Sequence, residues 1–517
     1  MYNTYIFYIR LKQNLSDIIL TTLNGRYSHT SIALKYLYAN LYDLQKSTSI
    51  QEYVINEKLQ DIAEKILLKK PKIVAIGVYI WNVSDISELI HYIKKVSPKT
   101  IIILGGPEVS YTPFRVDLNL ADYIIQGEGE IQFYELCKKV LNKQEIKQKM
   151  FPPIMVDINK IQLPYKYYND HDIQNRHIYV EASRGCPYSC EFCLSSIDKK
   201  VRNFNMDELL TQFKDLWQRG ARNFKFIDRT FNLNIKNASK LLDFFLEKDE
   251  PFTTHFEVIP DNFPIKLRDK IKLFPKHSLQ LEVGIQTLKE DIALNIQRKL
   301  NIPKIKDNLK FLENETNAHI HLDLIIGLPG ESLKSFGENL DYLCSLSNSE
   351  IQLGVLKKLS GTTLNRHDEV YGMVYSDIPP YEILSNDIID FNEMQHMKRF
   401  TRYWDLVYNS GNFVKTFKNL VENQSVYETF NNFTKWLYNQ TYSTWQISLD
   451  RLAKFLFDFM VEIQHKQKEL IAKDMVEDIL KVGGRKLPKF LREYSDVITS
   501  YDKLSVNSKN KRQQKRA

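Results

Sequence analysis

Apolar runs alternate with amphipathic stretches along residues 1–145, and this alternation limits the fold more than any other feature of the chain. The stretches with helical periodicity lie at residues 31–44, 60–69, 84–96 and 131–141. The apolar runs that we predict to be strands lie at residues 17–22, 50–54, 73–79, 100–104 and 123–126. Strands that alternate with helices form a parallel sheet covered on both faces. We therefore predict a doubly wound, Rossmann-like α/β domain that binds its ligand at the carboxyl ends of the strands.

A second alternation runs over residues 177–364. Six strands are expected there, at residues 177–181, 223–227, 254–258, 279–283, 319–325 and 350–355. Six β/α units are too few for a closed barrel of eight and predict an open (β/α)6 partial TIM barrel. In such barrels the chemistry takes place at the carboxyl ends of the strands.

The other segments show no β/α alternation. Residues 146–176 contain three prolines and little periodicity, so a linker is expected. Helical patterns at residues 381–408, 413–438 and 447–480 predict a helical C-terminal domain over residues 365–502. Residues 503–517 are expected to be a disordered basic tail. The tail contains no acid, and its cations are Lys503, Lys509, Lys511, Arg512, Lys515 and Arg516.

Composition favours a folded protein of the cytoplasm. Of the 517 residues, 43% are hydrophobic and 26% are charged, as in folded chains. Five cysteines are too few for a disulfide framework and fit a reducing compartment. No run approaches the roughly 20 apolar residues of a membrane span. The N-terminus lacks the cleavage site of a secretion signal. We therefore expect a cytoplasmic localisation and no membrane span.

Three cysteines lie close together in residues 182–196, which read ASRGCPYSCEFCLSS. Cys186, Cys190 and Cys193 have the spacing C-x3-C-x2-C and follow the first predicted strand of the barrel. Iron–sulfur clusters usually take four cysteines, but Cys137 and Cys344 lie far away in the sequence. A [4Fe–4S] cluster held by three thiolates would keep one iron open, as catalytic metal sites do. A zinc site completed by His171 or His177 is the alternative.

This segment resembles the signature of the radical S-adenosylmethionine (SAM) superfamily, in which an aromatic residue, here Phe192, precedes the third cysteine. The resemblance implies that Cys186, Cys190 and Cys193 bind a [4Fe–4S] cluster and that SAM chelates its open iron. One electron from the cluster then cleaves SAM to methionine and a 5′-deoxyadenosyl radical. It also implies an electron donor such as flavodoxin or ferredoxin.

Further segments resemble the same superfamily, and each follows or ends a predicted strand. They are FIDRTFN at 226–232, EVGIQT at 282–287, DLIIGLPGE at 323–331 and LKKLSGTT at 356–363. The resemblance implies SAM contacts by Phe192, Asp228, Glu282 and Gln286, although the glycine pair usual near Asp228 is absent. Glu257 also ends a strand. A structural role, with the carboxylate paired to an arginine or a helix terminus, is the alternative for Glu257 and Glu282.

Glycine-rich loops end three strands of the first domain, at residues 23–30, 104–110 and 126–130. Glycine lets the backbone approach a ligand, and no G-x-G-x-x-G fingerprint is present. The domain looks like the cobalamin-binding domain of B12-dependent radical SAM proteins. That resemblance implies cobalamin contacts by Gly105, Gly106, Glu108, Gly127 and Glu128. Stabilisation of a helix dipole is the alternative for Glu128 and Glu130.

The resemblance has one departure, because the D-x-H-x-x-G motif that supplies a histidine to cobalt is missing. The loop histidine His29 has a different context, YSHTS. Either cobalamin binds without a protein imidazole, or the domain has lost the ability to bind cobalamin.

The function implied is that of a radical SAM enzyme, a cobalamin-dependent methyltransferase of the subgroup with a helical C-terminal domain of unknown function. The substrate and the catalytic residues stay unidentified. Two alternatives are a cobalamin-independent radical SAM enzyme with a vestigial B12 domain and a zinc-stabilised nucleic-acid-binding protein. A nucleic-acid partner is not expected. A tRNA methylthiotransferase would carry three further cysteines in its first domain, where only Cys137 occurs.

Overall fold

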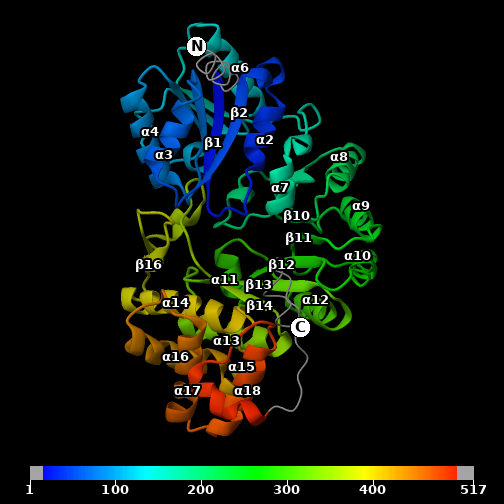
Figure 1. Ribbon diagram of the computed structural model, residues 1–517, viewed down its shortest axis with the longest axis vertical. Coiled ribbons are helices and arrows are strands. Elements are labelled where there is room, and N and C mark those ends of the chain that lie inside the picture. The colour runs from blue at the N-terminus through cyan, green and yellow to red at the C-terminus, as the bar shows by residue number, and fades with distance from the viewer. Residues whose placement is uncertain (1–14, 498–517) are drawn as a thin grey trace, which may run out of the picture.

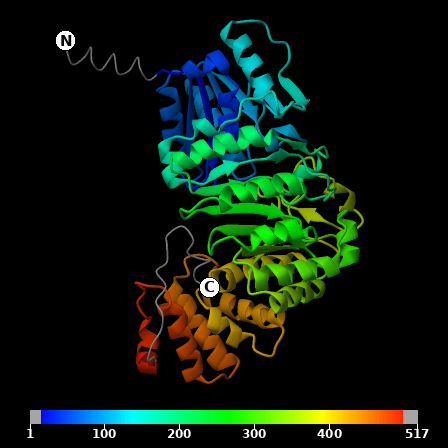
Figure 2. The same ribbon diagram turned by 90° about the vertical axis from the view of Figure 1, so that its right-hand side faces the viewer.

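The computed structural model describes residues 15–497, which form three parts stacked along the long axis of the molecule (Figure 1). The N-terminal α/β part lies at one end, the barrel strands and their helices lie in the middle, and the C-terminal helices lie at the other end. The side view shows the same order (Figure 2). The predicted basic tail lies outside the described residues.

The N-terminal part contains a six-stranded parallel sheet of strand order β2-β1-β3-β4-β5-β6. The strands are β1 (Ile18–Asn24), β2 (Thr48–Val54), β3 (Ile73–Gly77), β4 (Ile101–Gly105), β5 (Tyr123–Gly127) and β6 (Met150–Ile154). The helices are α2 (Ile32–Ala39), α3 (Leu59–Leu67), α4 (Val83–Val96), α5 (Pro107–Ser110) and α6 (Glu130–Leu141). All residues of β1 are buried, because apolar cores lie on both faces of the sheet. This confirms the doubly wound fold.

The expected linker is more regular than its sequence suggests. It contains β6, which pairs in parallel with β5, and the short helix α7 (Asp170–Asn175). Pro152 and Pro153 lie within β6. Proline is tolerated there because β6 is an edge strand, whose outer backbone needs no partner.

The central part is an open barrel of six parallel strands in the order β14-β13-β12-β11-β10-β7. The strands are β7 (Ile178–Val180), β10 (Asn223–Phe226), β11 (Thr253–Val258), β12 (Leu279–Gln286), β13 (His319–Ile326) and β14 (Glu350–Val355). The helices are α8 (Met206–Gln218), α9 (Ile235–Leu246), α10 (Ile265–Ile271), α11 (Glu290–Asn295), α12 (Ile302–Glu315) and α13 (Leu333–Leu346). Strands β12 and β13 alternate buried apolar residues with half-buried polar ones. Their polar side chains therefore share one face, which forms the inside of the barrel.

The C-terminal part is helical, with bounds that differ from the expected ones. Its helices are α14 (Phe391–Trp404), α15 (Val414–Leu420), α16 (Val426–Thr441), α17 (Leu449–Asp458) and α18 (Lys468–Leu480). Five-residue π-helical turns follow α14 and α17. The antiparallel pair β15 (Val374–Tyr375) and β16 (Ile383–Ser385) also corrects the expectation that strands end before residue 365. Both strands are too short to produce a period-two pattern.

Short elements complete the connections. A two-stranded antiparallel hairpin, β8 (Ser183–Arg184) and β9 (Arg202–Asn203), flanks the cysteine segment. The 3₁₀ segments lie at Tyr42–Ser47, Tyr165–Tyr167, Leu194–Ser196, Leu364–His367 and Lys489–Val497. Within the described residues, none of the helices is both long and apolar enough to cross a membrane.

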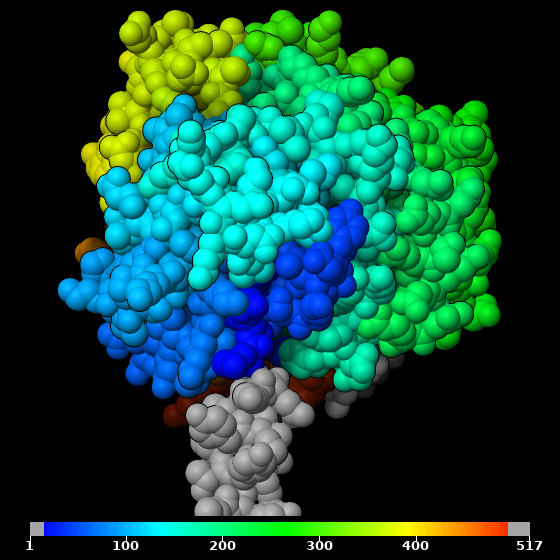
Figure 3. All heavy atoms as spheres, turned by 90° about the horizontal axis from the view of Figure 1, so that it is seen from above, coloured from blue at the N-terminus to red at the C-terminus, as the bar shows by residue number. Residues whose placement is uncertain are grey.

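The N-terminal part covers one end of the barrel. Seen from that end, its blue and cyan residues fill most of the view, with green barrel helices and yellow residues beside them (Figure 3). A buried hydrogen bond crosses between the parts, because the Tyr381 hydroxyl lies 2.8 Å from Glu108 Oε2. The Arg115 guanidinium stacks 3.5 Å from the Tyr381 ring centre. The residues around β15 and β16 thus join the barrel to the N-terminal sheet.

Candidate functional site

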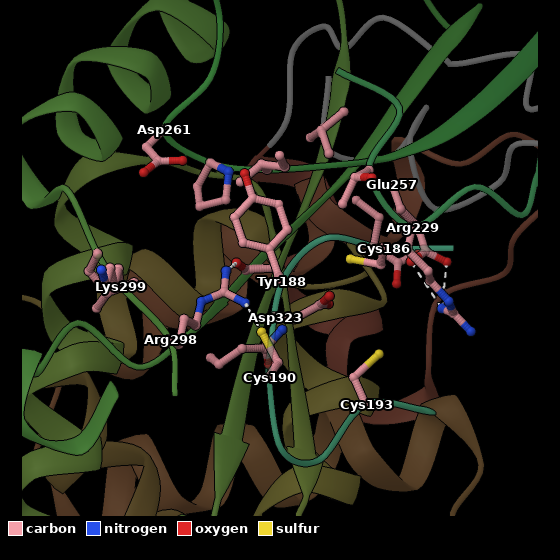
Figure 4. Close-up of a pocket in the computed structure, with 18 of the residues that line it drawn as sticks. Cys186, Tyr188, Cys190, Cys193, Arg229, Glu257, Asp261, Arg298, Lys299 and Asp323 are labelled. Carbon is pink, nitrogen blue, oxygen red and sulfur yellow. Dashed lines mark hydrogen bonds and ion pairs between the residues drawn. The ribbon is translucent and has the colours of Figure 1, made fainter. Parts of the chain in front are cut away.

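A cavity of about 230 Å³ opens at the carboxyl ends of β11, β12 and β13, and all three signature cysteines line it (Figure 4). The cysteines come from one loop between β8 and β9. Gly185 starts this loop with a φ of +87°, and a Cβ there would lie 2.5 Å from the Lys200 carbonyl oxygen. Only glycine fits this turn. The backbone N–H of Cys186 then donates to the Asp198 carbonyl at 2.8 Å, which closes the loop.

Glu191, between the second and third cysteines, fixes the middle of the loop. Its buried carboxylate lies 2.7 Å from Gln297 Nε2, 2.6 Å from Arg366 Nε and 2.6 Å from His367 Nε2. These partners lie after α11 and after β14, so the carboxylate joins the cysteine loop to two distant parts of the barrel. The sequence analysis did not identify Glu191, because its partners are 106 to 176 residues away.

Two arginines bring positive charge to the cysteine cavity. Arg298 Nη1 lies 3.8 Å from Cys190 Sγ, and the second terminal nitrogen of Arg298 donates to the Gly284 carbonyl. Arg229 contacts both oxygens of Glu257, at 2.9 and 3.0 Å. Burial raises the pKa of the Cys186 and Cys190 thiols, and Arg298 opposes that rise at Cys190. A cationic metal centre would favour the thiolates that burial disfavours.

Three of the four residues expected to contact SAM line the cysteine cavity, namely Phe192, Glu282 and Gln286. The structure does not bring Asp228 to this cavity. The Asp228 carboxylate accepts hydrogen bonds from Ala182 N at 2.9 Å and from Ser183 Oγ at 2.6 Å, so it holds the start of the cysteine segment instead. Lining residues that sequence reasoning did not single out include Tyr188, Arg229, Arg298 and Asp323.

The inside of the barrel carries a row of titratable groups that begins in this cavity, with Glu282 and Asp323, and continues along the strands. His255 Nε2 lies 3.1 Å from Glu282 Oε2. Burial acts to raise the pKa of Glu282, but His255 together with the nearby Lys225 and His321 lowers it overall. Burial, with Glu282 and Glu257 nearby, raises the pKa of Asp323 well above its usual range. Burial also lowers the pKa of His321 to about 3. The barrel interior is therefore polar, and it shifts the pKa values of these three groups away from their usual ranges.

The three cysteine sulfurs are spread more widely than the ligands of a single zinc ion. Around one tetrahedral zinc with Zn–S bonds of about 2.3 Å, thiolate sulfurs lie about 3.8 Å apart. Among residues 15–497, the three cysteine sulfurs do not form a group with all ligand atoms within 4.8 Å. Neither His171 nor His177 lines the cysteine cavity. His171 instead lies 2.5 Å from the Tyr27 hydroxyl, and His177 lines another cavity.

A second cavity, of about 450 Å³, lies at the carboxyl ends of β3, β4 and β5 of the N-terminal sheet. Gly105, Gly106, Gly127 and Glu128 line it, as expected for cobalamin contacts. Gly106 has a φ of +104°, and a Cβ there would lie 2.5 Å from the Val78 carbonyl oxygen. Glycine therefore lets the backbone form this wall of the cavity.

Glu108 and His29 do not line this cavity. The buried Glu108 carboxylate pairs with Tyr381, as described above. His29 lines the cavity that also contains His177, and their ring centres are 6.0 Å apart. The residues described around the second cavity include no histidine. A corrin ring placed there would thus find glycine backbone and open volume, which fit a large planar ligand, and no imidazole.

The two cavities lie on opposite sides of the cysteine loop. Cys193 lines the first, whereas the next two residues, Leu194 and Ser195, line the second. Arg184, just before the loop, also lines the second cavity and pairs there with Glu128, at 3.3 Å, and Glu130, at 2.8 Å. The cysteine loop therefore forms the wall between a barrel cavity and a Rossmann-like cavity.

This fold and these two cavities define an α/β protein whose open barrel presents a three-cysteine loop to a Rossmann-like domain. Family models identify it further. Residues 19–137 match the B12 binding domain, residues 180–343 match the Radical SAM superfamily, and residues 369–516 match a protein of unknown function (DUF4080). The chain therefore carries a radical SAM domain and a B12-binding domain. Its cofactors are accordingly a [4Fe–4S] cluster, SAM and cobalamin.

Individual relatives match this chain at low identity. The uncharacterized methyltransferase PH0819 of Pyrococcus horikoshii is 24% identical over 59% of this chain and 71% of its own length. The cobalamin-dependent radical SAM methyltransferase TokK of Streptomyces tokunonensis is 24% identical over 65% of this chain, which spans only 53% of TokK. The structure of OxsB, a cobalamin-dependent SAM radical enzyme solved with aqua-cobalamin and SAM, matches with a TM-score of 0.60 at 13% identity. That match covers 91% of this chain and 79% of OxsB and is a likeness of fold.

Proposed function

We propose that this protein is a cobalamin-dependent radical SAM methyltransferase. The single observation that carries the proposal is the position of the cysteine loop, which lines the barrel cavity with Cys193 and the Rossmann-like cavity with Leu194. Cofactors in the two cavities would be separated by one loop. The relatives PH0819 and TokK are named as methyltransferases, which supports the same class of reaction.

In the barrel cavity, Cys186, Cys190 and Cys193 would hold the cluster. Phe192, Glu282 and Gln286 remain our candidates for SAM contacts, and Arg298 joins them because its guanidinium faces the cavity beside Cys190. A guanidinium there can bind the carboxylate of an amino-acid ligand. When bound, the cluster and SAM supply a 5′-deoxyadenosyl radical, and methylcobalamin supplies the methyl group.

In the Rossmann-like cavity, the backbone of Gly105, Gly106 and Gly127 would lie against the corrin, with Glu128 at the edge. Glu128 is held in place by Arg202, at 2.7 and 2.9 Å, and by the backbone N–H of Val156 at 2.8 Å. This carboxylate is fixed before any ligand enters. An electron donor such as flavodoxin or ferredoxin, and a location in the reducing cytoplasm, belong to the same proposal.

The proposal is tested by anaerobic purification with hydroxocobalamin, followed by corrin and 5′-deoxyadenosine assays. Gly105→Leu should fill the cavity, because the nearest atom to a Cβ at Gly105 is 3.7 Å away and the backbone need not move. We expect this variant to lose corrin and to keep 5′-deoxyadenosine formation. Gly354→Leu is the matched control, because a Cβ there has the same 3.7 Å clearance and Gly354 does not line the cavity.

Two results would overturn the proposal. A wild-type protein that cleaves SAM but retains no corrin would favour the cobalamin-independent enzyme with a vestigial domain. Equal corrin content in Gly105→Leu and the wild type would show that corrin binds elsewhere.

A further inference from the structure

A group of metal-ligating side chains lies on β13 and β14, apart from the cysteines. His319 and His321 are two residues apart on β13 and point to the same side of the strand. Glu350 begins β14, directly beside His321 in the sheet register. Within residues 15–497, this is the only group of three or more His, Cys, Asp or Glu residues whose ligand atoms all lie within 4.8 Å of one another.

The distances in this group suit a single ion. His319 Nε2 lies 3.1 Å from Glu350 Oε1, and His321 Nε2 lies 3.6 Å from Glu350 Oε2. Around a tetrahedral ion with bonds of about 2.0–2.1 Å to nitrogen and oxygen, neighbouring ligand atoms lie about 3.3 Å apart. The two measured distances lie on either side of that value. Both imidazoles also present the same nitrogen, Nε2, to one carboxylate.

The surroundings of the group resemble the support that metal ligands receive. The side chains of His319, His321 and Glu350 are only 12%, 13% and 3% exposed. The Gln352 amide nitrogen Nε2 lies 2.7 Å from Nδ1 of His321, on the side of the ring opposite Nε2. A half-turn of this amide exchanges its nitrogen and oxygen. The oxygen then accepts the Nδ1 proton, which leaves the Nε2 lone pair of His321 for a metal.

The backbone that carries Glu350 is fixed by the C-terminal helices. Asn409 Oδ1 accepts from the backbone N–H of the next residue, Ile351, at 3.0 Å, and Trp404 Nε1 donates to its carbonyl at 2.9 Å. The carboxylate is therefore presented on a rigid strand. Such positions hold metal ligands more accurately than loops do.

We propose that His319, His321 and Glu350 bind a divalent transition-metal ion at the amino ends of β13 and β14, with a fourth position open to water. Two imidazoles and one carboxylate suit Zn²⁺ or Fe²⁺ rather than Ca²⁺ or Mg²⁺. The ion would join two neighbouring strands. Asp323 follows His319 by four residues on the same face of β13, about 13 Å along the strand. The ion would thus lie at the opposite end of the barrel from the cysteine cavity, which Asp323 lines.

The test uses full-length protein in which Cys186, Cys190 and Cys193 are all changed to alanine, so that neither a cluster nor thiolate-bound metal interferes. After treatment with a chelator and its removal, this variant is titrated with Co²⁺ alone. We expect one equivalent to bind, with visible d–d absorption and without thiolate-to-cobalt charge transfer. Absence of saturable binding would overturn the proposal.

Further variants in the same background locate the site. His321→Gln and Glu350→Gln should each lower Co²⁺ affinity at least 100-fold, because each removes a ligand. Gln352→Leu should lower it about 10-fold to 100-fold, the effect of losing support for a ligating histidine. The control His465→Gln, at an exposed position, should bind as the parent does. Equal affinity in all four would overturn the assignment.

A second measurement needs no substitution in the site. The thermal unfolding temperature of the variant without Cys186, Cys190 and Cys193 should rise when Zn²⁺ is added and fall back when a chelator removes it, because a ligand that binds only the folded state stabilises it. An unfolding temperature that changes with neither Zn²⁺ nor chelator would contradict the proposed metal site. Neither measurement involves SAM cleavage or methyl transfer, so the metal site and the proposed function can fail separately.

Discussion

Arg184 Nη2 lies 2.8 Å from Glu130 Oε1, and this contact ties the segment that enters the cysteine loop to the first turn of α6 in the N-terminal domain. The same nitrogen lies 2.9 Å from Glu181 Oε1. All three side chains are at most 14% exposed. A buried arginine between carboxylates of two domains fixes the loop and the second cavity relative to each other.

Arg184→Ala is expected to lower the stability of the protein and to weaken the binding site in the second cavity. It leaves buried carboxylates without their cation, which typically costs about 3–5 kcal/mol of the free energy of unfolding. Because Arg184, Glu130 and Glu181 all line the second cavity, corrin retention should fall as well. Denaturant unfolding and corrin content measure the two effects.

A matched control is Lys240→Ala, which breaks the exposed 2.9 Å pair with Asp207. Its stability should change by no more than about 1 kcal/mol. The stability and corrin content of Arg184→Lys should lie between those of Arg184→Ala and the wild type, because lysine keeps the positive charge but lacks the planar guanidinium group. Wild-type corrin content and stability in Arg184→Ala would contradict the role assigned to Arg184.

Glu191→Gln should reduce cluster content although all three cysteines remain. The substitution removes the buried charge that faces Arg366 and His367, at a cost of about 3 kcal/mol or more. The loop would then lose its connection to the segment after β14. Iron and sulfide, measured after anaerobic reconstitution, should fall below half of the wild-type content.

Glu369→Gln is the control for this prediction, because Glu369 is exposed and lies two residues beyond His367. It should retain full iron and sulfide. Equal content in both variants would show that the Glu191 contacts do not hold the loop.

Asp228 makes the stability of the protein depend on pH. Burial raises the pKa of Asp228 to about 7, in spite of the hydrogen bonds from Ser183 and Ala182, whereas an aspartate in an unfolded chain titrates near 3.9. Between about pH 4 and pH 7 the folded state holds a proton that the unfolded chain has released, so stability falls as pH rises. Above pH 7 the accumulated cost is about 4 kcal/mol.

Asp228→Asn should remove this dependence, since the amide does not ionise. The variant should gain stability relative to the wild type between pH 5 and pH 8, as measured by denaturant unfolding at both values. Burial also raises the pKa of Glu331 to about 7 and that of Asp478 to about 6. These groups make the stability of both proteins depend on pH, so the effect of Asp228 is read from the difference between the variant and the wild type. A constant difference between the two proteins would refute a raised pKa at Asp228.

The sequence predicts the two parallel sheets because buried strands leave long Ile-rich and Val-rich runs, as at residues 73–77 and 101–105. It misses β6, whose prolines are accepted only because the strand lies at an edge. The C-terminal helices were expected to be longer than they are. The helix expected at residues 381–408 begins only at Phe391, because β16 precedes it, and the helix expected at residues 447–480 is interrupted by the π-helical turn at residues 459–463.

The candidate site is predicted unevenly for a physical reason. The spacing of the three cysteines identifies them as a candidate metal site, whereas Phe192, Glu282 and Gln286 lie in short segments that resemble those of the radical SAM superfamily. The roles of Glu191, Arg298 and the His319–His321–Glu350 group depend on contacts between distant strands. Asp228 has the expected position in the chain, but its carboxylate turns toward Ser183, and that direction depends on tertiary packing.

The central claim is that Cys186, Cys190 and Cys193 together hold a cluster that cleaves SAM. The most direct measurement is 5′-deoxyadenosine formation, with iron and sulfide content, in anaerobically reconstituted single Cys→Ala variants of all five cysteines. We expect Cys186→Ala, Cys190→Ala and Cys193→Ala each to abolish the product, and Cys137→Ala and Cys344→Ala to retain it. Undiminished SAM cleavage in any of the first three variants, or a reconstituted wild type without sulfide, would contradict the claim.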